Sequence, residues 1–87
     1  MIYNVKTRIQ SYKQNTTITT TDFGGWLVVN TGTGAIQVNK ITLQPSEGLD
    51  FTQLPPNVIW GSPIQIVISE PGGEATLTQL IYKEDKR

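Results

Sequence analysis

Short runs of alternating apolar and polar residues, each ended by Gly, Pro, Asn or Asp, make up most of this sequence. In residues 64–69, IQIVIS, isoleucine occupies every second position. A period of two places successive side chains on opposite faces of a strand. Gly and Pro recur too often for a long helix, and the abundant Ile, Val and Thr have branched Cβ atoms that suit a pleated sheet. The chain is therefore predicted to be all-β.

The alternation predicts about seven or eight short strands separated by turn signals. We expect these strands at residues 2–12, 15–21, 26–30, 36–38, 41–43, 49–54, 64–69 and 74–83. Many short strands are typical of sandwiches and barrels, so we expect one small antiparallel β-sandwich or barrel, jelly-roll-like, over residues 1–87. The periodicity leaves open a jelly roll, an immunoglobulin-like sandwich and an OB-type barrel. The polar residues 83–87 are expected to form a frayed tail.

Period two also assigns side chains to faces. Residues 3, 5, 7 and 9 share one face of the first predicted strand, and Lys6 and Arg8 share the other. Residues 26–30 are apolar on both faces, so this strand is expected in the interior of a sheet. Leu49 and Phe51 are both expected to point inward.

Three turns carry specific expectations. Asn39-Lys40 is predicted as a tight hairpin turn, because Asn tolerates a left-handed backbone. The sequence EPGG at 70–73 is predicted as a second hairpin turn. NTGTG, residues 30–34, is predicted as a loop whose two glycines are available for positive φ.

The chain length limits how the fold is stabilised. A domain of 87 residues buries roughly 60–65% of the surface of its unfolded chain, and domains this small usually need an additional staple. The sequence contains no cysteine and no histidine, which excludes a disulfide and makes a conventional zinc site implausible. We therefore expect the chain to associate with copies of itself or with a larger assembly.

Charge and hydropathy limit the classes of partner that this chain is expected to bind. Seven basic residues balance seven acidic ones, whereas nucleic-acid binders carry a basic excess, so the balance argues against nucleic acid. The apolar run at 26–29 is far shorter than the roughly 20 residues of a spanning helix, so no membrane segment is expected. The start, MIYNVKTRIQ, has no apolar core region, and we expect synthesis in a cytoplasm without a secretion signal.

Candidates for catalysis are few. Histidine and cysteine, a common general base and a common nucleophile, are absent. Glu70 and Glu74 flank a turn and could form a carboxylate pair of the kind that hydrolyses glycosides, or they could be ordinary solvated turn residues. GTG at 32–34 lacks the Gly-Lys-Ser/Thr that completes a phosphate loop. We expect no catalytic residue, no cofactor and no metal site.

Aromatic residues are the better functional candidates. Trp26 lies in an apolar run and is expected in the core. Trp60 lies in the Pro-rich segment 55–63, either as an exposed anchor for sugars, bases or proteins or as a plug at the end of the sandwich. Tyr3, Tyr12 and Tyr82 are near strand ends, and with Trp60 they are the candidate residues of an interface between subunits.

Residues 26–51 contain a series of turn motifs: Val28-Val29-Asn30-Thr31-Gly32, then Val38-Asn39, then Leu43-Gln44-Pro45 leading to Phe51. This series resembles a strand–turn–strand pattern in small structural proteins of bacterial viruses, although Lys40 replaces the Gly that often follows the Asn. The resemblance implies a virion protein of the capsid decoration, spike or fibre type. It further implies a β-sandwich that associates as a trimer or other ring and with other virion proteins, and that performs no reaction.

A second class of function stays open, which is a small β-barrel binding module for single-stranded nucleic acid or glycan. In this reading Trp60 and residues 55–57 form a stacking platform, and Lys6, Arg8 and Lys13 contact phosphates.

Overall fold

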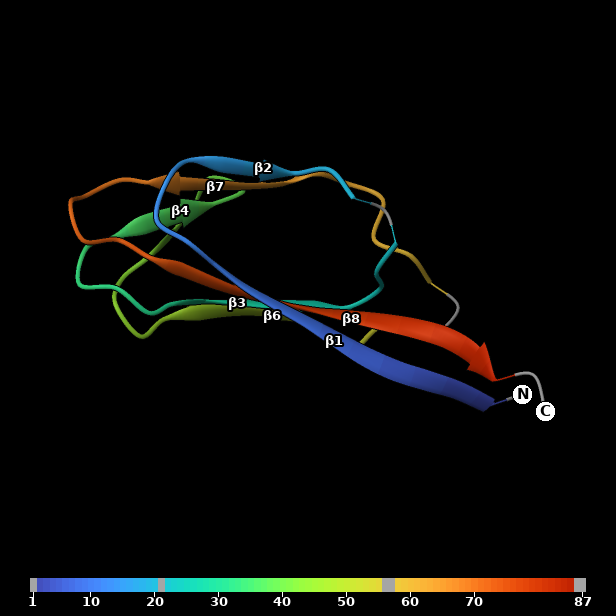
Figure 1. Ribbon diagram of the computed structural model, residues 1–87. Helices are drawn as coiled ribbons and strands as arrows, with labels where there is room; N and C mark the ends of the chain where they lie inside the picture. The colour runs from blue at the N-terminus through green and yellow to red at the C-terminus, as the bar shows by residue number, and fades with distance from the viewer. Residues whose placement is uncertain (1, 21, 56–57, 86–87) are drawn as a thin grey trace.

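Eight strands form two antiparallel sheets of four strands each (Figure 1). The computed structural model describes residues 2–20, 22–55 and 58–85, in which there is no helix, and describes only the backbone of residues 2, 3 and 83–85. The strands are β1 (Ile2–Tyr12), β2 (Thr16–Ile18), β3 (Trp26–Asn30), β4 (Ile36–Val38), β5 (Ile41–Leu43), β6 (Gly48–Phe51), β7 (Ile64–Ile68) and β8 (Ala75–Asp85). The all-β prediction is confirmed.

The order of the strands identifies the type of sandwich. One sheet has the order β1-β8-β3-β6 and the other the order β2-β7-β4-β5. The first half of the chain therefore pairs with the second half from the inside out: β4 with β5, β3 with β6, β2 with β7 and β1 with β8. This is one long hairpin, with its tip between β4 and β5, wrapped into two sheets. Such wrapping is the arrangement of an eight-stranded jelly roll, so the jelly-roll-like prediction is confirmed.

The core lies between the two sheets. The burial pattern alternates along β3, where Trp26, Val28 and Asn30 are buried and the residues between them are half-buried. β3 lies between β8 and β6, as the apolar character of both its faces predicts. The buried apolar residues are Ile18, Phe23, Trp26, Val28, Ala35, Ile36, Val38, Leu43, Ile64, Ile66, Ala75 and Leu77. Period two thus produces the packed layer expected of a sandwich.

The tight turn between β4 and β5 is also confirmed. Asn39 and Lys40 have φ of 49° and 70°, the left-handed values that a two-residue hairpin of type I′ requires at both positions. The Asn39 side chain additionally accepts a hydrogen bond from the backbone N–H of Gln65 at 2.8 Å, which ties this turn to β7.

One turn prediction is wrong. Residues 70–73 do not close a hairpin, because β7 belongs to one sheet and β8 to the other, so the turn carries the chain between sheets. Gly32 and Gly34 do not adopt positive φ. Glycine is required at both positions because there is no room for a side chain. A Cβ atom on Gly32 would collide with the carbonyl oxygen of Gly72, and a Cβ atom on Gly34 would collide with the carbonyl oxygen of Pro71.

Several strand ends differ from expectation. β2 ends at Ile18, and Thr21 lies outside the described residues. β6 ends at Phe51. The predicted frayed tail at 83–87 is partly wrong, because β8 continues to Asp85 with its backbone paired to β1, while residues 86–87 lie outside the described range. Pairing with a neighbouring strand overrides the polar composition of this segment.

β1 and β8 extend beyond the rest of the sandwich. β8 pairs with β1 along its whole length but with β3 only from Ala75 to Gln79. The pairs formed by residues 2–6 with 81–85 therefore make a two-stranded extension, here called the β1–β8 arm, which ends near both termini (Figure 1). The molecule measures 49 × 20 × 17 Å as a result.

Candidate association surface

Carboxylates in the described residues support the backbone. Glu70 accepts a hydrogen bond from the N–H of Ala35 at 2.8 Å, so it fastens the turn at 70–73 to the loop before β4. Glu47 accepts one from the N–H of Gln44 at 2.7 Å. Within residues 2–20, 22–55 and 58–85, no three acidic side chains are grouped closely enough to hold a metal ion, and no helix has the length and apolar character to cross a membrane.

Arg8 forms the one salt bridge found among the described residues. Its guanidinium donates two hydrogen bonds to the Asp22 carboxylate, at 3.0 and 2.9 Å, and a third from Nε to Oε1 of Gln79 at 2.8 Å. The hydrogen bonds from Arg8 lower the pKa of Asp22, and the same pair raises the pKa of Arg8. Arg8 is therefore held toward β8 with its charge compensated.

A polar groove runs along the inner side of β1 and past β2. It has a volume of about 350 Å³ and is lined by Arg8, Gln10, Tyr12, Gln79 and the threonine-rich segment 16–20. Gln79 is 2% exposed, and its Nε2 has no hydrogen-bond partner within the described structure. Hydroxyl and amide groups of this kind can bind sugar hydroxyls.

Trp60 closes one end of the sandwich. Its ring centroid lies 5.2 Å from that of Trp26 and 5.3 Å from that of Phe51, and Phe51 stacks on Trp26 at 4.8 Å. The backbone N–H of Trp60 donates to the carbonyl of Phe23 at 2.9 Å. The ring is half-buried against the core, with its Nε1 enclosed, so Trp60 is a plug. Ile59 beside it is 63% exposed.

The first sheet exposes apolar side chains on its outer face, the face turned away from the second sheet. Val5 is opposite Tyr82 in the pairing of β1 with β8, and Ile9 is opposite Thr78. Val5 is 54% exposed and Ile9 is 63% exposed. The period-two pattern placed both residues correctly on one face, but it could not show that no second layer covers that face.

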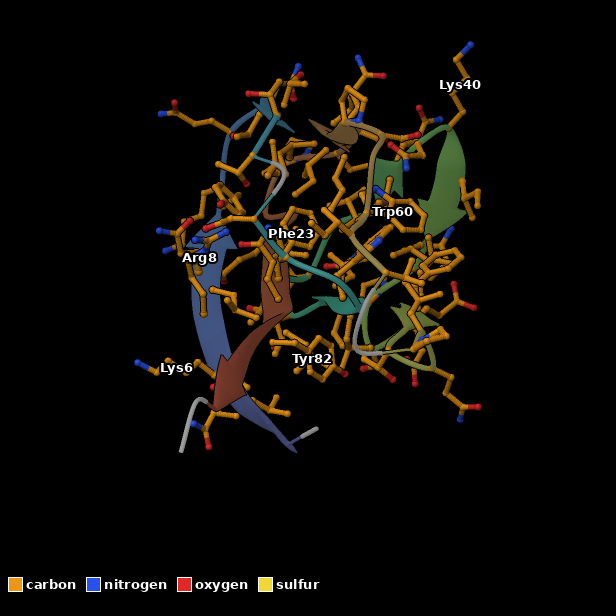
Figure 2. The ribbon with its side chains drawn as sticks, turned by 90° about the vertical axis from the view of Figure 1, so that its right-hand side faces the viewer. Lys6, Arg8, Phe23, Lys40, Trp60 and Tyr82 are labelled. Atoms are coloured by element: carbon orange, nitrogen blue, oxygen red, sulfur yellow. The ribbon has the colours of Figure 1, made fainter. Side chains whose placement is uncertain are left out.

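The four predicted interface residues do not form one patch. Tyr12 and Tyr82 are opposite Ala75 and Val5 respectively, so about 24 Å of strand separates them. Trp60 lies on the side of the molecule away from β1 (Figure 2). Tyr3 is in β1, but its side chain is outside the described part of the chain. Their role in association stays a prediction.

Sequence reasoning did not select Val5, Ile9 or Ile59. Val5 and Ile9 are aliphatic strand residues of the kind that a period-two pattern normally assigns to a core, whereas Ile59 lies in the segment 55–63, which shows no such period. One signal in the sequence could have indicated the exposure of Val5 and Ile9. Two small sheets bury only one face each, and the sequence contains more apolar strand faces than that. Comparisons with protein-family models, with curated proteins and with solved structures found no match.

Proposed function

We propose that this protein is a non-enzymatic structural subunit that acts by binding other protein surfaces, including copies of itself, in a phage capsid decoration, spike or fibre assembly. The observation that carries the proposal is the β1–β8 arm with the exposed outer face beside it. A two-stranded ribbon is marginally stable alone in water, and covering it with another protein surface stabilises it.

Three further features agree with this proposal. The balanced charge gives copies of the chain little mutual repulsion. The jelly roll is an architecture found in viral capsid domains, although it occurs in lectin domains as well. The turn motifs at residues 26–51 resemble those of small virion proteins, and this resemblance is the reason for choosing a virion over another assembly.

The native mass tests the proposal. Sedimentation equilibrium or light scattering over a wide concentration range is expected to give a multiple of the 9.6 kDa chain mass. A mass of one chain at the highest concentration would overturn it. Addition of purified particles of the source virus, followed by pelleting, tests the virion assignment, which predicts that the protein pellets with them.

A glycan-binding module is the second candidate, and the threonine-lined groove beside Arg8 and Gln79 is the observation in its favour. Phosphate binding has less support, because the charge of Arg8 is already compensated by Asp22. Titration with oligosaccharides and with oligonucleotides, followed by calorimetry, separates these readings. Binding heat on addition of sugars that is lost in the Gln79→Leu variant supports the glycan site. The absence of binding heat with both oligosaccharides and oligonucleotides would exclude both binding functions.

A further inference from the structure

The four edges of the two sheets differ greatly in length. β2 and β5 border one sheet with 3 residues each, and β6 borders the other with 4. β1, the remaining edge, has 11 residues. Very short edge strands are one way in which proteins prevent pairing with other chains. Three edges have this protection and β1 does not.

The free edge of β1, the side away from β8, can accept another strand. In an antiparallel pair, each residue directs its N–H and C=O either to the partner or away from it, in alternation. About half of the backbone polar groups of β1 therefore point to the free edge, where no strand of the described chain meets them. Residues 2–12 contain no Pro, so every N–H there can donate.

We infer that the free edge of β1 binds β1 of a second copy in antiparallel orientation, with a twofold axis at Thr7. This inference rests on the proposed function, because it names the surface through which copies associate. In this register Val5 lies opposite the partner's Ile9, and Ile9 opposite the partner's Val5. Among the described side chains of β1, these two are the most exposed apolar ones, and they then cover each other on the outer face, as favourable cross-strand pairs do.

Neighbouring registers fit less well. A twofold axis at Lys6 puts two Lys6 residues opposite each other and Val5 opposite the partner's Thr7. An axis at Arg8 puts Ile9 opposite the partner's Thr7 and Val5 opposite the partner's Ser11, so neither apolar side chain meets another. With the axis at Thr7, Lys6 is opposite the partner's Arg8, but the Arg8 guanidinium is held toward Gln79 in β8, away from the free edge. Its charge is also compensated by Asp22.

The size of the contact sets its strength. Eleven paired residues span about 37 Å, and a strand edge with its side chains is about 10 Å deep, so each copy buries on the order of 400 Å². About ten backbone hydrogen bonds accompany this area. The total is at the low end of specific interfaces, so we expect a dissociation constant on the order of micromolar.

Cysteine cross-linking tests the register. The chain has no cysteine, so each introduced thiol is unique. Thr7 is exposed, and in the proposed register the two Thr7 Cα atoms are about 4.5–5.5 Å apart, within the range of a disulfide. Thr7→Cys is therefore expected to form a covalent dimer under mild oxidation. Val5→Cys is the control, because its two copies would be about 14 Å apart and should not cross-link. The double variant Val5→Cys/Ile9→Cys should cross-link again.

Charge substitution tests the energetic contribution. Val5→Lys/Ile9→Lys should weaken dimerisation about tenfold or more, because it places ammonium groups in the paired apolar positions. The matched control is Ile59→Lys, which replaces a side chain with the same 63% exposure as Ile9 but lies in the loop beside Trp60, and it should leave the dissociation constant unchanged.

The outcomes separate the two proposals. A wild-type protein of one chain mass at all concentrations overturns the proposed function and the β1 contact together. A multimer in which Thr7→Cys fails to cross-link, or which Ile59→Lys disrupts while Val5→Lys/Ile9→Lys does not, overturns the β1 contact only. A trimer whose Thr7 cysteines do not cross-link overturns the twofold pairing in the same way.

Discussion

Asn30 is expected to be the most important polar residue for stability. It is 1% exposed at the end of β3, and its side chain makes three hydrogen bonds to the backbone. Nδ2 donates to the carbonyls of Gly34 and Leu43, at 2.8 and 3.0 Å, and Oδ1 accepts from the N–H of Gly32 at 3.0 Å. Leu43 belongs to the other sheet, so Asn30 fastens the two sheets together at this point.

The substitution Asn30→Ala removes all three bonds. It leaves two of the backbone partners, the carbonyls of Gly34 and Leu43, in a buried place and the third, the N–H of Gly32, in a half-buried one. Each hydrogen bond contributes about 1 kcal/mol net, and a buried group left unpaired costs about 1–3 kcal/mol. We therefore expect a loss of about 3–5 kcal/mol in the free energy of unfolding. A chain of this length has a total of about 4–13 kcal/mol, so the loss is a large part of it.

Urea unfolding followed by tryptophan fluorescence measures this effect, because Trp26 is fully buried. With a slope near 1.5 kcal/mol per molar, the midpoint should fall by about 2–3 M. Asn15→Ala is the control, since Asn15 also accepts a backbone hydrogen bond, from Ile68 at 2.8 Å, but in an exposed position. It should cost less than about 1 kcal/mol, because water replaces the lost acceptor. Equal effects of the two substitutions would show that burial does not make the loss of the Asn30 hydrogen bonds more costly.

Other predictions concern turns and pH. Gly72→Ala should destabilise the fold by about 1–2 kcal/mol, because φ is 86° there, whereas Gly61→Ala, with open space around it, should be neutral in the same thermal melt. Lys40→Gly should stabilise by about 0.5–1 kcal/mol, since its φ of 70° costs a Cβ-bearing residue more than it costs Gly, and an unchanged melting temperature would contradict this. Asp22 has a lowered pKa in the folded protein, so its contribution to stability is present above its ordinary pKa of 3.8 and is lost as the pH falls through the lower folded value. Acid unfolding of Asp22→Asn should accordingly lack this part of the pH dependence, and an unaltered profile would show that the pair with Arg8 contributes nothing.

Local patterns were sufficient to predict the class of fold. The apolar run at residues 26–29 predicts that Trp26 lies in the core, and the structure buries Trp26 completely. The Asn39-Lys40 turn follows from the tolerance of Asn for a left-handed backbone. Leu49 and Phe51 share the inward face as predicted, and Phe51 packs on Trp26 while remaining 36% exposed.

Features that depend on distant residues could not be predicted in the same way. The burial of Gln79 and its contact with Arg8 join residues 71 positions apart. Gly32 is needed because the backbone of Gly72 approaches it, which only the wrapping of the chain brings about. Val5 and Ile9 are exposed because they lie on the outer face of the first sheet, and no pattern within β1 records which of its two faces turns toward the second sheet.

Hydrogen exchange along β1 measures directly whether the free edge of β1 is covered by a second copy in the assembly. The amides of β1 that donate to β8 should be protected at every concentration, and they serve as an internal reference. The alternate amides, which point to the free edge, should exchange rapidly in dilute protein and become protected as the concentration rises through the association range. Rapid exchange of these alternate amides in a fully associated sample would contradict the account, because the free edge of β1 would then be uncovered in the assembly.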